Sequence, residues 1–151
     1  MLNCMFDTNI FNRILKCPAE LSKFDGKVIA HATHIQRDEI SNTSDTVRRD
    51  ALNQIFDHVT SAIVPTESFI WGITAWGQGR WGVGDLYMEL QADLDNLNKG
   101  KANNIQDALI AETSIRGGYI LVTEDRDLAS ITKKHGGQCM SLQELLQKCN
   151  T

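Results

Sequence analysis

The sequence lacks any apolar run long enough to cross a membrane. None of its 151 residues belongs to a stretch that approaches the ~20 apolar residues needed to span a bilayer. The N-terminus, MLNCMFDTNIF, has neither the basic start nor the apolar length of a signal peptide. These two absences predict a cytoplasmic protein with no membrane association.

Cysteines at disulfide or zinc-binding spacing are also missing. The four cysteines are scattered, with no CxxC motif and no nearby pair of histidines: Cys4, Cys17, Cys139 and Cys149. This spacing matches no small secreted scaffold and no common zinc site. We therefore expect reduced cysteines and no structural zinc.

The chain has no excess of basic charge. It carries 15 Lys and Arg against 19 Asp and Glu, a formal net charge of −4. Because phosphate binding needs a basic surface, this balance argues against a simple nucleic-acid coat protein, although an enzyme with an acidic site remains compatible with it. The local basic residues belong either to solvated helix faces or to phosphate contacts: Arg37, Arg48, Arg49, Arg80, Lys133 and Lys134.

Short apolar segments alternate with segments of helical periodicity. Strands are predicted at 2–6, 27–32, 61–65, 119–122 and 138–140. Helices are predicted at 10–16, 34–40, 45–58, 82–97, 103–116 and 128–135, with a last one after residue 141. Thr33 and Ser44 are expected N-caps, and Ser141 to Glu144 is a capping box.

This alternation, with few hairpin signals, predicts an α/β fold, a three-layer α/β/α sandwich around a mainly parallel sheet. No repeat, low-complexity tract or linker divides the chain, so we expect a single domain over residues 1–151.

The segment Ser68 to Asp85 does not follow this rhythm. It holds all three tryptophans and five of the eleven glycines. One interpretation is a core strand with glycine turns, and the other is an aromatic loop that packs against a partner. We expect the part from Trp71 to Trp81 to be partly exposed.

Four acidic residues are placed where a parallel sheet binds ligands, beyond the carboxyl ends of its strands. Asp7 and Asp125 each follow a predicted strand directly, whereas Glu39 and Asp107 lie on predicted helices. Each has a simpler explanation, because Asp7 and Asp125 can cap the helices that follow and helical acids are mostly solvated. Taken together, the four could converge on one edge of one sheet.

The motifs FDTNIF, HIQRDEI and QDALIAETSIRGGYILVTEDRDL resemble those of the PIN-domain family of metal-dependent nucleases, and within it the VapC-like toxins. The resemblance runs from Leu2 to about Met140, in the family's order. It implies the PIN-like fold and a set of metal-binding, catalytic acids at Asp7, Glu39, Asp107 and Asp125, with Asp127 as an accessory acid.

The resemblance also assigns supporting roles around these acids. Thr8 and Thr123 would hold the cluster, and Asn9 would fix the turn after the first strand. Asp38, adjacent to Glu39, is an alternative ligand. The chain departs from the family at Leu128, where an aromatic residue is usual, and in its Trp/Gly segment.

Crowded carboxylates raise one another's pKa and need a counter-charge. Oxygen-only ligands favour a hard cation, so Mg²⁺ or Mn²⁺ is expected rather than zinc. In such a site the metal activates water for attack on a phosphodiester, with Asp125 as the preferred residue to orient or deprotonate it. Arg37 and Arg126 are the nearest candidates for phosphate contacts. The resemblance implies an RNA substrate, a cognate antitoxin and a homodimer.

Two other functions remain as alternatives. ILVTEDRDLAS also looks like the strand and Asp-x-Asp of an aspartate-based phosphatase, but only 24 residues follow Asp127, too few for the further motifs such enzymes need. The other alternative is a PIN-like binding or scaffolding module without catalysis.

Overall fold

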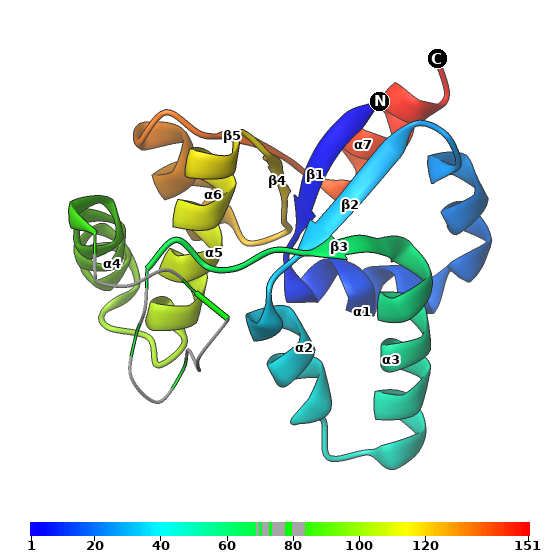
Figure 1. Ribbon diagram of the computed structural model, residues 1–151, viewed down its shortest axis with the longest axis horizontal. Helices are drawn as coiled ribbons and strands as arrows, with labels where there is room; N and C mark the ends of the chain where they lie inside the picture. Colours follow the sequence, from blue (N-terminus) through cyan, green and yellow to red (C-terminus); the bar gives the residue numbers. More distant parts are fainter. Residues whose placement is uncertain (69, 71–72, 74–77, 80–83) are drawn as a thin grey trace.

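The computed structural model of the protein describes residues 1–68, 70, 73, 78–79 and 84–151 (Figure 1). All three tryptophans lie outside these residues, so the expected exposure of the Trp/Gly segment stays a prediction. At the borders of this segment, Thr66 forms a parallel bridge with Gly79, and Ile70 and Ile73 pack against the core.

The centre of the fold is a parallel sheet. Its strands are β1 (Leu2–Phe6), β2 (Val28–Ala32), β3 (Thr60–Ile63), β4 (Ile120–Val122) and β5 (Gln138–Met140). They lie in the order β3-β2-β1-β4-β5, and every pairing is parallel. β1 is the middle strand, and its last residue, Phe6, is opposite Val122, the last residue of β4. The carboxyl ends of these two strands are therefore neighbours.

The helices are close to those predicted. They are α1 (Thr8–Lys16), α2 (His34–Ser41), α3 (Thr46–Val59), α4 (Asp85–Asn98), α5 (Asn104–Gly117), α6 (Arg126–Lys134) and α7 (Leu142–Cys149), with a 3₁₀ helix, η1 (Pro18–Phe24). The 3₁₀ helix was not predicted, because Pro18 indicated only the end of a helix, whereas it also fits the start of the next one.

Two local predictions for α3 were wrong. Its N-cap is Asp45, not Ser44, since the Asp45 carboxylate accepts hydrogen bonds from the amides of Val47 and Arg48. The spacing of Val47 from Ala51 and Leu52 also predicts that it lies on the buried face of α3, but Val47 is 80% exposed. Val47 is in the first turn of α3. A residue at the end of a helix can have the spacing of the buried face and still lie beyond the apolar core.

Helices cover both faces of the sheet, so the expected three-layer sandwich is confirmed (Figure 1). Adjacent residues of β1 point to opposite faces, as they do in any strand. Phe6 packs with apolar residues of η1, α1, α3 and α7, while Met5 packs with those of α4, α5 and α6. Each layer thus has its own apolar core, and the polar site lies at the strand ends between them.

All four cysteines are free thiols, and Cys4 is fully buried on β1. Within the described ranges, no helix has the length and apolar character to traverse a bilayer.

Candidate functional site

The ends of β1 and β4 are tied together by a threonine hydroxyl. The Asp7 amide donates to the Val122 carbonyl at 3.0 Å, which continues the strand pairing by one residue. Thr123 Oγ1 then donates to Asp7 Oδ2 at 2.7 Å and accepts a hydrogen bond from the Asp125 amide at 3.0 Å. One side chain therefore sets the positions of both strand-end acids.

Asn9 forms a second connection between these two strand ends. Its amide donates to Thr123 Oγ1 at 3.4 Å, and its carbonyl oxygen accepts from the Glu124 amide at 3.3 Å. The expected supporting residues Asn9 and Thr123 thus contact each other, although they are 114 residues apart in the sequence.

Asp7 and Asp125 are also helix N-caps, as the simpler interpretation expected. Asp7 Oδ1 accepts from the Thr8 amide at 2.8 Å at the start of α1. Asp125 Oδ1 accepts from the amides of Asp127 and Leu128, at 2.9 and 3.1 Å, at the start of α6. Each acid keeps an oxygen that is not used by its cap.

Glu39 reaches the site from α2, whose start is fixed by a capping box. The Thr33 side chain accepts from the Ile35 amide at 3.1 Å, and the Gln36 side chain accepts from the Thr33 amide at 2.9 Å. Gln36 Nε2 also donates to the carbonyl of Phe6 at 3.0 Å, one residue before Asp7. α2 is therefore anchored to the end of β1. Sequence reasoning missed this role of Gln36, although its position three residues after Thr33 was a usable signal.

The Glu39 carboxyl is in an environment that opposes ionisation. Burial, followed by the charges of Asp7 and Asp38, raises the pKa of Glu39 to about 7. The nearby Thr8 hydroxyl reduces this rise in pKa, yet neither Thr8 Oγ1 nor Glu39 Oε1 completes a hydrogen bond with a described residue. Since Asp38 is exposed, the buried, unpartnered oxygen favours Glu39 over Asp38 as a ligand.

Asp107 is the residue on which the charges of the other three acids act. It lies on the first turn of α5 and is only 6% exposed, so the expectation of a solvated helix residue is wrong. Its pKa is raised to about 8, first by burial and then by the charges of Asp7, Glu39 and Asp125, against a small opposing effect of Lys101. Three acids from separate parts of the chain therefore raise the pKa of one carboxyl.

Asp7 shows the same tendency. Burial raises the pKa of the Asp7 carboxyl, the charge of Asp125 raises it further, and hydrogen bonds from Thr123, Thr8 and Asn9 oppose the rise. The combined effect is a group of carboxyls with raised pKa values at the end of the sheet, a common property of functional sites.

The donor chemistry of these residues fits a hard divalent cation, since every side-chain donor is a carboxylate oxygen and one of them, Glu39 Oε1, is buried without a partner among described residues. The positions of these side chains, however, do not form a complete metal site. No three Asp, Glu, His or Cys side chains in the described part of the chain lie close enough together to hold a metal ion. The Asp7 carboxylate instead accepts from the Thr8 amide and the Thr123 hydroxyl, and the Asp125 carboxylate accepts from the amides of Asp127 and Leu128.

The two accessory residues Asp127 and Arg37 make different contacts. Asp127 contacts Asp125 through its amide, and no described contact brings its carboxylate to the other acids. Arg37 is committed to α3, where it donates to Asn53 at 2.9 Å, pairs with Asp57 and lies over the Phe56 ring. These contacts disfavour Arg37 as a phosphate contact.

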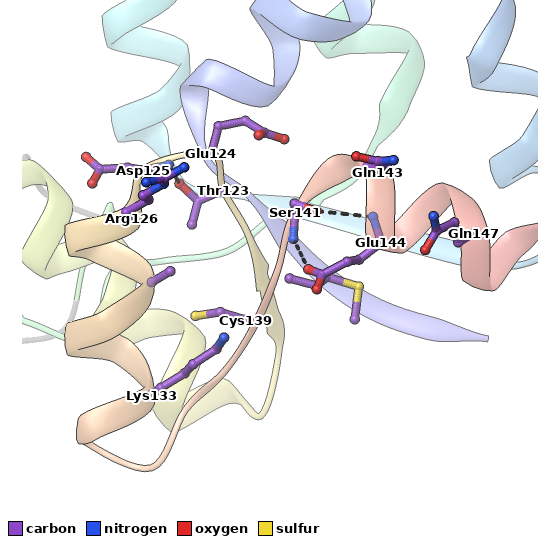
Figure 2. A pocket seen from close by; sticks show the side chains of 12 residues that line it. Thr123, Glu124, Asp125, Arg126, Lys133, Cys139, Ser141, Gln143, Glu144 and Gln147 are labelled. Atoms are coloured by element: carbon purple, nitrogen blue, oxygen red, sulfur yellow. Dashed lines mark hydrogen bonds between the residues drawn. The ribbon is translucent and has the colours of Figure 1, made fainter.

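A pocket of about 350 Å³ lies beside Glu39, lined in part by Asp38 and Gln106. Gln106 Oε1 is buried and has no hydrogen-bond partner among the described residues. This residue could not be singled out from the sequence, because a glutamine in the first turn of a helix is usually solvated. A second pocket, next to Asp125, is shown in Figure 2 together with Thr123 and Arg126.

Comparisons with other proteins give a match only at the level of structure. No protein-family model matches the chain, and no curated protein matches its sequence. Several solved structures resemble it, and two of them match over nearly all of their length.

The first is VapBC2 from Rickettsia felis, solved bound to a DNA fragment from their promoter. It has a TM-score of 0.58 and 18% identity, and the match covers 93% of this chain and 98% of that one. The second is PAE2754 from Pyrobaculum aerophilum, with a TM-score of 0.52 and 14% identity over 99% of this chain and 97% of that one. At these identities the likeness concerns the fold alone: the chain shares the fold of these two structures, which agrees with the expected PIN-like α/β/α sandwich.

Proposed function

We propose that the protein is an endoribonuclease that depends on Mg²⁺ or Mn²⁺. The observation that supports this most is the mutual effect of its acids: Asp7, Glu39 and Asp107 all have raised pKa values, and each is affected by at least one of the others or by Asp125. A divalent cation is the counter-charge that lets such carboxyls ionise together.

The acidic residues and Arg126 would have different roles in the reaction. Asp7, Glu39 and Asp107 would hold the cation, which when bound supplies Lewis-acid polarisation of a phosphodiester and acidifies water. Asp125, oriented by Thr123 and by its cap, positions the attacking water and takes its proton. Arg126 follows it directly and makes no ion pair with a described residue, so its guanidinium is available for a phosphate oxygen.

The substrate and partner follow from the resemblance. RNA is the substrate that VapC-like sequences imply, and the structural likeness to VapBC2 supports a toxin that is neutralised by a cognate antitoxin. A homodimer is part of the same proposal.

The test is to change the two strand-end acids to their amides. Asp7→Asn and Asp125→Asn keep the shape and the helix cap, because Asn caps almost as well as Asp. Cleavage of a mixed-sequence RNA with Mn²⁺ is expected to fall at least ~100-fold, as is usual when a catalytic acid or base is lost. The fold should persist by circular dichroism.

Asp45→Asn is the matched control, since it makes the same change at the N-cap of α3. It should cleave like the parent. Full activity of both Asp7→Asn and Asp125→Asn would disprove the proposed function.

A PIN-like binding module without catalysis is the second candidate. It is favoured by the separation of the acids, because no three of them in the described ranges lie close enough to hold an ion. The two candidates differ in their response to metal. A nuclease site should gain thermal stability from Mn²⁺, whereas a binding module that has lost the site should not.

A further inference from the structure

The pocket next to Asp125 extends away from the candidate catalytic acids. It has a volume of about 600 Å³, well within the ~300–1,000 Å³ of small-ligand sites. Thr123 and Asp125 form part of its lining, so it opens directly beside the proposed cleavage site. A strand bound across Asp125 therefore has room in this pocket for an adjacent nucleotide.

Two helices form its opposite walls (Figure 2). Arg126, Ala129 and Lys133 are spaced to lie on one face of α6, and Gln143 and Gln147 are one turn apart on α7. Cys139 and Met140 of β5 contribute apolar contacts between the walls. The lining thus combines cations, amides and a small apolar surface, in contrast to the apolar groove that a peptide helix requires.

The carboxylates in the lining already have partners. Glu144 accepts from the Ser141 amide at 2.7 Å, within the α7 capping box. Glu124 Oε1 accepts from the Leu142 amide at 3.0 Å, and its Oε2 is 3.8 Å from Arg13. By contrast, the side chains of Arg126 and Lys133 make no hydrogen bond or ion pair with any residue that the structure describes. The Lys133 charge acts on Glu144 at longer range, where it helps to lower the pKa of that carboxyl. Both cations can therefore contact an anionic ligand.

Lys133 is seven residues beyond Arg126, which places it about 10 Å further along α6 at 1.5 Å per residue. The two cations are therefore too far apart for one phosphate group. They suit two phosphates of a single strand, one near Asp125 and one beyond it.

We infer that this pocket binds a nucleotide of the RNA strand next to the cleaved bond, with Lys133 on its phosphate and the amide of Gln147 on the edge of its base. This inference rests on the proposed function for its substrate class. Amide side chains can both donate to and accept from a base edge, so Gln147 contributes to the choice of cleavage sequence.

The phosphate contact is tested with Lys133→Ala against Lys134→Ala. These neighbouring lysines carry the same charge, but Lys134 lies outside the pocket lining and pairs with Asp93 on α4 at 3.0 Å. Binding of a fluorescent single-stranded RNA is measured by anisotropy in EDTA, which needs no cleavage, over a series of salt concentrations.

Lys133→Ala should weaken binding several-fold and reduce the slope of log K against log salt by about 0.7, the value for one phosphate contact to a single strand. Lys134→Ala should change neither. Equal behaviour of the two variants would overturn the inference and leave the proposed function standing. Failure of the parent to bind RNA would overturn both. Binding without cleavage in Mn²⁺, with the slope change intact, would remove the proposed function alone.

The base contact is tested with Gln147→Ala, and Gln54→Ala is the control on the exposed part of α3. Sites cut in a mixed-sequence RNA with Mn²⁺ are mapped for both. Gln147→Ala should broaden the base preference at one position beside the cut while the salt slope stays unchanged. A cleavage pattern identical to that of Gln54→Ala would overturn the role of Gln147.

Discussion

At the scale of the residue, Asp107 is the most sensitive reporter of the acidic site. Its pKa of about 8 compares with ~3.9 for an aspartate in an unfolded chain. Between these values the folded chain binds a proton that the unfolded chain does not, so the free energy of unfolding falls as the pH rises from about 4 to about 8.

Asp107→Asn removes this dependence. In buffer without divalent metal at pH 8.5, the variant should be more stable than the parent by at least ~2 kcal/mol, given ~1.4 kcal/mol for each unit of pKa shift. At pH 4 the two should be equal. Urea unfolding at both pH values measures the difference.

Asp50→Asn, on the exposed surface of α3, is the control and should have no effect at either pH. If Asp107→Asn instead lost stability equally at pH 4 and pH 8.5, Asp107 would act as a structural residue rather than as a crowded acid.

The same residues show what a sequence reveals about a site. The strand-end positions of Asp7 and Asp125 were predictable because strand ends can be located from apolar runs. The raised pKa of Asp107 was not, since it arises from burial in the folded chain and from the charges of residues far apart in the sequence. Arg37 was predicted to contact phosphate because it lies close to Glu39 in the sequence. Its ion pair with Asp57 on α3 could not be predicted in the same way, since the two residues are brought together by the packing of α2 and α3.

At the scale of the element, α2 is the part whose position the site depends on most. Its capping box is attached to the end of β1 through Gln36 and Phe6. Thr33→Ala should cost about 1 kcal/mol of stability through the lost cap. It should also loosen the position of Glu39 and therefore reduce the thermal shift produced by Mn²⁺.

Asp45→Ala removes an N-cap that contributes a similar amount to stability, but from α3 and away from the four acids of the site. It should lower the melting temperature to a similar extent and leave the Mn²⁺ shift unchanged. Thermal unfolding of both variants with and without Mn²⁺ separates the two effects. Equal Mn²⁺ shifts in the two would contradict a positioning role for α2.

Elements were the part of the fold that the sequence predicted best. Every strand was located to within about two residues, because each is a short apolar segment between helical ones. The cap of α3 and the 3₁₀ helix were missed, since Ser44 and Asp45 are both good N-caps and Pro18 fits either a helix end or a helix start.

At the scale of the whole molecule, the raised pKa values of Asp7, Glu39 and Asp107 act together. In the absence of divalent metal, the free energy of unfolding should decline steadily from about pH 5 to pH 8. Over this range these carboxyls hold protons in the folded chain that they release in the unfolded chain, so a rise in pH favours unfolding. The sign is opposite to that of a protein stabilised by ion-paired carboxylates.

Mn²⁺ or Mg²⁺ should reverse this decline. At a concentration of 100 Kd the expected stabilisation is about 2.7 kcal/mol, and it should increase with pH because the ligands must lose their protons. Melting temperatures from pH 5 to pH 8 measure it, with KCl at matched ionic strength as the control for screening. A metal effect that is absent, or that is the same at all pH values, would contradict an acidic metal site.

The central position of β1 has a consequence for how the protein is made. β1 leaves the ribosome before its neighbour β4, and Thr123, the residue that holds Asp7, comes 116 residues after Asp7. Since synthesis proceeds from the N-terminus, an emerging chain can pair β1 with β2 and still lack half of its acidic site. The proposed nuclease is therefore inactive until Thr123 and Asp125 have left the ribosome. Before that point, neither the messenger RNA that encodes it nor the ribosome that reads it meets an assembled site.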